Sequence, residues 1–319
     1  ILMEKDFYFW TIINNYIKGI KQKSRVNSFV QNLYNKYGYG YDDINDAQLL
    51  MELQNYNMLQ DNPYIATGQS GYFHEQIMSN GLGNLKLKPQ DIEDAKFISS
   101  CFGKNTMYSE NNIPVTYTTL LGTTEFNYGT RTFPAGIFED VFQGLDHDFP
   151  IQPIVGESEQ DFYLRILNFQ IDSFENFNPM FKQEVLVRGK RLINNFCSYT
   201  NKIYLIKLKD IENIKASFGD VNGLRDGTVS LEEAQRIIED LPTFSQLLSS
   251  FRIDSSMVYS DPNMQSEYGI ALYGKIPYEK ISFIEVKRKY EMIQKRAIDL
   301  GYSVGDTIPL NFDTEKFRK

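Results

Sequence analysis

The sequence predicts an α+β fold, because it contains both helix-like and strand-like segments that do not alternate regularly. Residues 203–208 (Ile-Tyr-Leu-Ile-Lys-Leu) and 281–286 (Ile-Ser-Phe-Ile-Glu-Val) have the composition of strands. Residues 157–200 instead carry apolar side chains in the spacing typical of helices. With 319 residues, 42% hydrophobic and 23% charged, the chain has ordinary globular composition and is long enough for one large domain or two small ones.

Residues 1–61 are predicted to form a helical N-terminal segment. Apolar residues recur at helical spacing between Phe7 and Ile20, and again between Val26 and Tyr34. Asp46 is expected to be the N-cap of a further short helix, because aspartate accepts hydrogen bonds from the first N–H groups of a helix. We interpret this segment as a cap that packs on the domain that follows.

Residues 62–319 are predicted to form the second domain, with a helical insertion at about residues 157–250. A short strand at 64–67 is expected to end at Gly68, and a helix at 72–80 is expected to end at Gly81. Pro89 and the acids after it favour the start of another helix, over residues 89–98. The other expected elements are strands at 115–119 and 269–273, a short helix at 122–128 and a helix at 287–300.

Composition and charge argue against several classes of function. The net charge of −8 disfavours nucleic acid as the main partner, because phosphate binding requires a basic surface. The two cysteines, Cys101 and Cys197, and the two histidines, His74 and His147, cannot assemble a zinc site by their spacing. No apolar run reaches the roughly 18 residues of a membrane span, and the first residues lack a signal-peptide pattern. The expected location stays open between the cytoplasm and delivery as an effector.

Several short motifs occur in order between residues 62 and 290. Residues 67–69 (Thr-Gly-Gln) end the first expected strand, and residues 77–82 (Ile-Met-Ser-Asn-Gly-Leu) end the helix after it. Residues 116–119 (Thr-Tyr-Thr-Thr) form the next strand, and Tyr128 follows eleven residues after Tyr117. Residues 266–268 (Ser-Glu-Tyr) then open an apolar strand-like run.

This set of motifs resembles the ADP-ribosyltransferase fold, in particular its His-Tyr-Glu branch, which includes the poly-ADP-ribose polymerases and the diphtheria-type toxins. The family has His-Gly-Thr or His-Gly-Ser where this chain has residues 67–69, and an Ile-x-x-x-Gly-Leu ending like that of residues 77–82. Residues 276–281 (Ile-Pro-Tyr-Glu-Lys-Ile) are similar to the Ile-Pro-x-x-x-Ile pattern that follows the family's Glu-Tyr strand.

The resemblance implies a split β-sheet core and an NAD-binding site. It assigns catalysis to Glu267 together with Tyr117. The implied activity is NAD-dependent mono-ADP-ribosyl transfer to a protein acceptor, or NAD glycohydrolysis. Gln265 stands where toxin-type members place a residue that contacts the target side chain. The residues implied in NAD binding are Thr67, Gly68, Tyr117 and Tyr128.

The chemistry of these residue types suits NAD. Nicotinamide is a flat cationic ring in NAD, so two tyrosine faces can hold it by stacking and cation–π attraction. A glycine such as Gly68 allows the carboxamide to approach the backbone, because no Cβ stands in the way. Cleavage of the glycosidic bond leaves positive charge on the ribose, which the carboxylate of Glu267 can stabilise.

Two alternatives remain at this point. Thr67 replaces the family's histidine, and its shorter hydroxyl reaches less far toward the adenosine ribose, so a non-catalytic interaction module with the same fold is the first. Tyr117 and Tyr128 could equally be core aromatics, Glu267 a solvated strand-edge carboxylate and Gly68 a turn residue.

The second alternative is a calcium-binding regulatory protein. Residues 220–233 resemble an EF-hand loop, with Asp220, Asn222, Asp226 and Glu233 as candidate ligands. This stretch spans fourteen residues, which is longer than the EF-hand loop. Helical patterns are expected on both sides, at 211–218 and 231–241, and Ser230 could instead simply cap the second helix.

Overall fold

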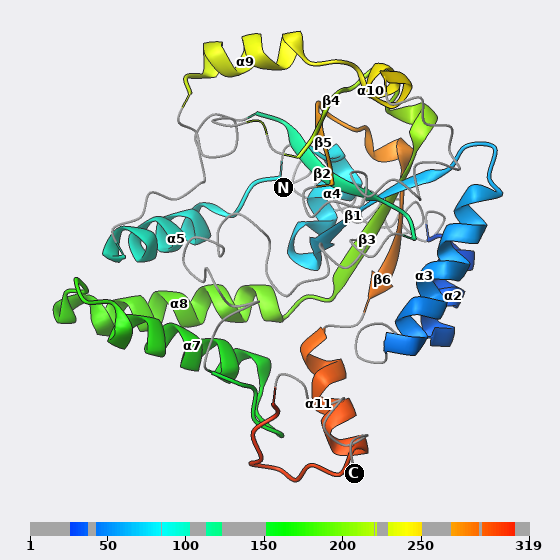
Figure 1. Ribbon diagram of the computed structural model, residues 1–319. Coiled ribbons are helices and arrows are strands. Elements are labelled where there is room, and N and C mark those ends of the chain that lie inside the picture. The colour runs from blue at the N-terminus through cyan, green and yellow to red at the C-terminus, as the bar shows by residue number, and fades with distance from the viewer. Residues whose placement is uncertain are drawn as a thin grey trace, which may run out of the picture.

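The computed structural model describes residues 26–37, 43–83, 85–102, 113–122, 151–219, 221, 229–250, 269–286 and 289–309. Within these ranges nine α-helices surround a six-stranded sheet (Figure 1). The predicted α+β class is therefore confirmed. The same ranges contain no helix that is long and apolar enough to cross a membrane.

The sheet is antiparallel throughout. Its strands lie side by side in the order β4-β5-β2-β1-β3-β6. β1 and β3 pair along seven residues, and β3 and β6 along six, so β3 lies inside the sheet. The strands are β1 (Tyr64–Ser70), β2 (Val115–Leu120), β3 (Asn201–Lys207), β4 (Lys215–Phe218), β5 (Ile270–Tyr273) and β6 (Ile281–Val286).

Strand β3 is buried along nearly its whole length because helices cover both faces of the sheet. Successive side chains of a strand point to opposite faces. Tyr204 and Ile206 therefore join one apolar cluster, and Ile203 and Leu205 join another. Burial on both faces explains why this strand was recognisable as a continuous apolar run.

The face of Ile203 and Leu205 is covered by α2 (Ser28–Tyr37) and α3 (Asp43–Met58), which lie against each other (Figure 1). The expected N-terminal cap thus packs on the sheet, as far as its described residues go. The side chains of the two helices that are buried against this face are Val30, Leu33, Tyr34, Leu49 and Leu53.

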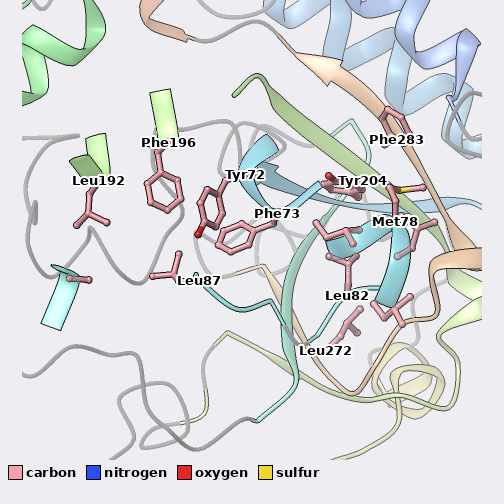
Figure 2. Packing of buried hydrophobic residues seen from close by; sticks show 14 of the residues in the cluster. Tyr72, Phe73, Met78, Leu82, Leu87, Leu192, Phe196, Tyr204, Leu272 and Phe283 are labelled. Atoms are coloured by element: carbon pink, nitrogen blue, oxygen red, sulfur yellow. The ribbon is translucent and has the colours of Figure 1, made fainter. Parts of the chain in front are cut away.

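The opposite face is covered by helices from the rest of the chain. Tyr72, in the short 3-10 turn η1 (Gly71–Phe73), lies between two rings of this core, with centroid distances of 4.9 Å to Phe73 and 4.6 Å to Phe196 (Figure 2). Leu82 and Leu272 belong to the same core (Figure 2). The helices that contribute to it are α4 (His74–Asn80), α5 (Pro89–Cys101), α7 (Glu159–Ser173), α8 (Lys182–Cys197) and α10 (Phe244–Ser250).

The remaining helices are α9 (Leu231–Asp240), which packs on β5, and α11 (Lys289–Asp299), which follows β6. α9 contacts β5 through Ala234, in a cluster with Ala271 and Tyr273. α11 forms a small core of its own with Val155 and Ile308. Three further 3-10 turns are η3 (Pro179–Phe181), η4 (Leu208–Asp210) and η5 (Tyr278–Lys280).

The outer edge of β6 is protected by the start of α2. The backbone N–H of Asn27 donates to the carbonyl of Phe283 at 3.1 Å. Gln31 then uses its side-chain amide as a neighbouring strand would use its backbone: Nε2 donates to the Glu285 carbonyl at 3.1 Å, and Oε1 accepts from the Glu285 N–H at 2.9 Å. Covering an edge in this way prevents it from pairing with another chain.

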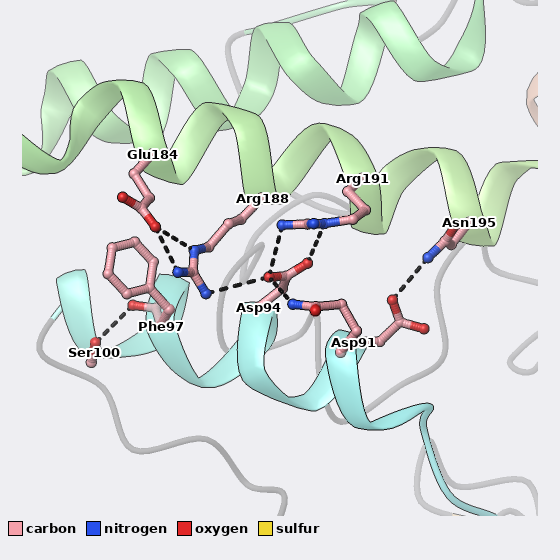
Figure 3. A network of polar contacts seen from close by, with 9 residues as sticks. Asp91, Asp94, Phe97, Ser100, Glu184, Arg188, Arg191 and Asn195 are labelled. Carbon is pink, nitrogen blue, oxygen red and sulfur yellow. Dashed lines mark hydrogen bonds and ion pairs between the residues drawn. The ribbon is translucent and has the colours of Figure 1, made fainter.

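A buried carboxylate joins α5 to α8 (Figure 3). Asp94 has 0% exposure, and its oxygens accept from Arg191 Nε at 2.7 Å and Nη2 at 3.2 Å, and from Arg188 Nη1 at 3.4 Å. One turn earlier, Asp91 accepts from Tyr72 Oη at 2.6 Å and Asn195 Nδ2 at 2.8 Å. These contacts tie the helix pair to the turn that follows β1.

Substitution of Asp94 by alanine is predicted to lower the free energy of unfolding by about 3 kcal/mol, because it leaves the guanidinium groups of Arg188 and Arg191 without their buried partner. The control is Asp172→Ala, because Asp172 pairs with Lys182 at the surface, where both side chains are about half exposed. That change should cost less than about 1 kcal/mol. Urea denaturation of both variants checks the difference, and equal losses would contradict it.

Most expected elements match the structure closely, including β2, α4, α5, β6 and α9. One correction concerns Gly68, which was expected to end the first strand. β1 continues to Ser70, because Gly68 pairs with Ile203 in the ladder with β3. A long neighbouring strand thus overrides the tendency of glycine to end a strand.

Two further expectations are wrong. Asp46 is not an N-cap, because α3 begins at Asp43, so that Asp46 lies inside the helix. Residues 211–218 do not form a helix, because residues 215–218 are strand β4 and pair with β5. The expected helical insertion at about 157–250 therefore contains the strands β3 and β4 as well as helices.

Candidate functional site

The sheet opens between β1 and β2. Among the described residues these strands pair at only two positions, Ile65 with Leu120 and Ala66 with Thr119. β1 nevertheless continues to Ser70 alongside β3, and β2 begins at Val115 alongside β5. We call residues 67–70 of β1 and 115–118 of β2 the β1–β2 opening.

The backbone of Gly68 faces this opening. The carbonyl of Pro63 accepts from Leu208, on the β3 side, whereas the carbonyl of Tyr64 accepts from Leu121, on the β2 side. Backbone polar groups point alternately to the two sides of a strand, so the even-numbered residues of β1 point toward β2. The N–H and C=O of Gly68 are therefore directed at the stretch where β1 and β2 no longer pair.

The side chains of Thr67 and Tyr117 lie on opposite faces of the sheet. Thr67 is 4% exposed and stands beside Tyr204, on the face that α4 covers. Its hydroxyl accepts from Gln69 Nε2 at 3.4 Å. Tyr117 is partly buried and packs with Ala271 on the face that α9 covers. A ligand between the two strands would therefore have Thr67 on one face of the sheet and Tyr117 on the other.

Asn57 of α3 closes one end of the opening. Its side chain has 0% exposure; Oδ1 accepts from the N–H of Tyr64 at 2.6 Å, and Nδ2 donates to the Tyr64 carbonyl at 2.9 Å and to the Leu121 carbonyl at 3.5 Å. These contacts join β1 to β2 where the two strands still pair. The sequence offered little to identify this residue, because an asparagine within a helix usually faces solvent.

The turn after α4 fixes the connection between β5 and β6. Leu82 and Ile276 exchange two backbone hydrogen bonds of 3.0 Å. Gly81 has φ 84° and ψ −169°, a combination that essentially only glycine adopts, and a Cβ there would lie 1.9 Å from the Ile276 carbonyl oxygen. The residues of the expected Ile-x-x-x-Gly-Leu ending thus hold the C-terminal end of β5 in place.

Substitution of Gly81 by alanine is predicted to cost more than about 3 kcal/mol, because it adds a backbone clash to an unfavourable dihedral angle. Gly305 is the matched control, since it also has a positive φ, 96°, but a Cβ there meets no atom within 4 Å. Gly305→Ala should cost only about 1 kcal/mol. Thermal denaturation of Gly81→Ala and Gly305→Ala measures the difference. Equal shifts in melting temperature would show that the contact with the Ile276 carbonyl does not contribute.

A titratable cluster adjoins Thr67 on the α4 face. His74 Nδ1 lies 2.8 Å from Tyr204 Oη, and the buried ammonium of Lys202 pairs with Glu285 at 2.6 Å. Burial, with a smaller contribution from Lys202, lowers the pKa of His74 to about 4. Burial also raises the pKa of Tyr204. Both groups are therefore neutral near pH 7, and the cluster carries only the Lys202–Glu285 pair of charges.

This lowered pKa predicts a pH dependence of stability. Between the ordinary pKa of 6.5 and about 4, the unfolded chain binds a proton at His74 that the folded protein does not. Stability from this group is complete above about pH 6.5 and is lost as the pH falls toward about 4, by at most about 3 kcal/mol. Chemical denaturation at a series of pH values should show that the free energy of unfolding falls less steeply between pH 6.5 and about 4 in His74→Gln than in the wild type. The same pH dependence of the free energy of unfolding in both proteins would contradict the lowered pKa of His74.

The predicted site residues divide into two groups. Thr67, Gly68 and Tyr117 border the β1–β2 opening, whereas Tyr128, Gln265 and Glu267 lie outside the described residues. Sequence reasoning did not single out Asn57, and it included Gln69 only as the last residue of the motif at 67–69.

The calcium prediction is largely outside the described residues as well, since Asp220, Asn222 and Asp226 are not described. Glu233 lies in the first turn of α9, where its N–H donates to Ser230 Oγ and its carboxylate pairs with Arg236 at 3.4 Å. Ser230 thus caps this helix, as the alternative interpretation expected. Within the described ranges, no group of three or more His, Cys, Asp or Glu side chains is placed to hold a metal ion. Calcium binding stays a prediction.

A surface pocket of about 430 Å³ lies between α5 and α8 and is lined by residues of these helices and η3, not by β1 or β2. Its two arginines, Arg188 and Arg191, already hold Asp94. The opening, in contrast, combines a directed backbone with polar side chains, so it is the better candidate site. No protein-family model, curated protein or solved structure matches this chain.

Proposed function

We propose that this protein binds NAD at the β1–β2 opening and transfers ADP-ribose from it. The observation that carries the proposal is that the backbone of Gly68 is directed into an opening of the sheet that Tyr117 borders on the other side. An interrupted sheet of this kind agrees with the split core that the sequence resemblance implies. Backbone N–H and C=O groups that face the same space suit a carboxamide, which needs one acceptor and one donor.

The connectivity of β5 supports the role of Glu267. Ile270 begins β5 and pairs with Thr118 of β2, next to the opening. Glu267 precedes Ile270 by three residues along the chain, so we assign its carboxylate to the same site. A carboxylate delivered there can stabilise the positive charge that forms on the ribose as nicotinamide leaves. Tyr117 and Tyr128 would supply the aromatic faces for the pyridinium ring.

The proposed reaction is mono-ADP-ribosyl transfer to a protein acceptor, with Gln265 as a candidate contact to the acceptor side chain. NAD glycohydrolysis is the same bond cleavage with water as the acceptor. The two differ only in what takes the ribosyl cation, so both depend on Glu267 and on NAD binding.

We predict that Glu267→Gln lowers the rate of NAD cleavage or automodification by about a hundredfold or more, because the amide cannot compensate the positive charge. The matched control is Glu279→Gln, an exposed carboxylate in the turn before β6, which should keep the wild-type rate. Release of nicotinamide is the measurement for both variants. Equal turnover of wild type and Glu267→Gln would remove the catalytic role.

One observation favours the non-catalytic module as a second candidate. Thr67 stands where the resembling family has histidine, and its hydroxyl is buried and already accepts from Gln69. Because the Thr67 hydroxyl is already hydrogen-bonded within the protein, it should bind the adenosine ribose more weakly than the histidine of the resembling family. Calorimetry of the wild type with NAD distinguishes the candidates, because a module without a nucleotide site releases no heat of binding.

A further inference from the structure

The hydroxyl of Thr116 is buried, and it has no hydrogen-bond partner in the described part of the chain. Thr116 is 3% exposed, and its Oγ1 is one of four buried side-chain polar atoms without a partner among the described residues. Buried hydroxyls are nearly always hydrogen-bonded, because an unpaired one loses its interaction with water and gains nothing in return. An exception in a strand that borders the candidate site calls for a physical reason.

The register places Thr116 at the β1–β2 opening. Continuing from Ile65–Leu120 and Ala66–Thr119, the antiparallel register sets Thr67 across from Thr118 and Gln69 across from Thr116. Because residues opposite one another share a face, all four of these polar side chains are on the face that α4 covers.

The neighbours of Thr116 differ from it in one respect. Thr118 Oγ1 donates to the carbonyl of Ile270 at 2.9 Å, and Thr67 Oγ1 accepts from Gln69. Of these three threonines, Thr116 is the one whose hydroxyl has no partner among the residues that the structure describes. Its cross-strand partner on β5 is the apolar Leu272, which offers no hydrogen bond.

We infer that the Thr116 hydroxyl binds an uncharged polar group of the nucleotide in the opening, a ribose hydroxyl or the carboxamide. This inference rests on the proposed NAD site and adds a specificity-determining residue to it. An uncharged group fits because the cross-strand neighbour Leu272 is apolar and the buried ammonium on this face, Lys202, is already paired with Glu285, so a phosphate buried here would lose its hydration without a cation that is free to compensate it. A hydroxyl can either donate to or accept from such a group.

The test compares NAD affinity with stability in one set of variants. Thr116→Val keeps the shape of the side chain and removes the hydroxyl, so it should weaken NAD binding by about tenfold, the value of one hydrogen bond. It should leave the melting temperature equal to or above that of the wild type, since the removed hydroxyl has no partner within the described ranges. Thr116→Ser keeps the hydroxyl and should bind NAD like the wild type.

Two controls complete the set. Ser282→Ala removes another unpartnered buried hydroxyl on β6, which β1 and β3 separate from the opening, and it should leave NAD affinity unchanged. Thr118→Val removes a hydroxyl that is hydrogen-bonded within the protein and should lower the melting temperature. If Thr116→Val does not fold, Thr116→Ala takes its place.

The possible outcomes test the role of Thr116 separately from the proposed NAD site. Wild-type affinity in Thr116→Val, with NAD still bound, overturns the role of Thr116 and leaves the NAD site standing. Weakened binding in Ser282→Ala as well as Thr116→Val also overturns it, because the effect would not be specific to the opening. Absence of NAD binding by the wild-type protein overturns both.

Discussion

The pairing of β1 with β3 is the interaction on which the rest of the structure depends. It runs over seven residues inside the sheet, with apolar side chains buried on both faces. Because β1 pairs with β3 along its full length, it stays an ordered strand although it pairs with β2 only near its start. The backbone of Gly68 can therefore be directed into an unpaired stretch without disorder of the strand that carries it.

The opening is bounded by contacts that come from distant parts of the chain. Asn57 of α3 joins β1 to β2 at the end where they still pair. The turn at Gly81 and Leu82 holds the far end of β5, which itself pairs with β2. A segment held from both ends in this way can be rigid although its two strands do not pair along their whole length.

The sequence predicted the elements better than the site. The spacing of apolar residues identified α4 and α8, Pro89 and the acids after it identified the start of α5, and strand-like composition identified β2 and β6. The prediction failed at residues 211–218, where the spacing of Ile211, Ile214 and Phe218 is also compatible with a helix. There the choice was made by backbone hydrogen bonds to β5, and these have no signature in the local sequence.

For the site, local sequence pointed to Thr67, Gly68 and Tyr117 through residue type and resemblance, and these three do border one opening. It did not point to Asn57 or Thr116, because an asparagine in a helix and a threonine in a strand are ordinary until their partners are known. The amino-acid sequence by itself determined most of the segments that become helices and strands, through the spacing and type of their residues; residues 211–218 are an exception. Only the tertiary structure decided where β1 and β2 part, because strand pairing is a long-range competition for hydrogen bonds among segments that are far apart in the chain.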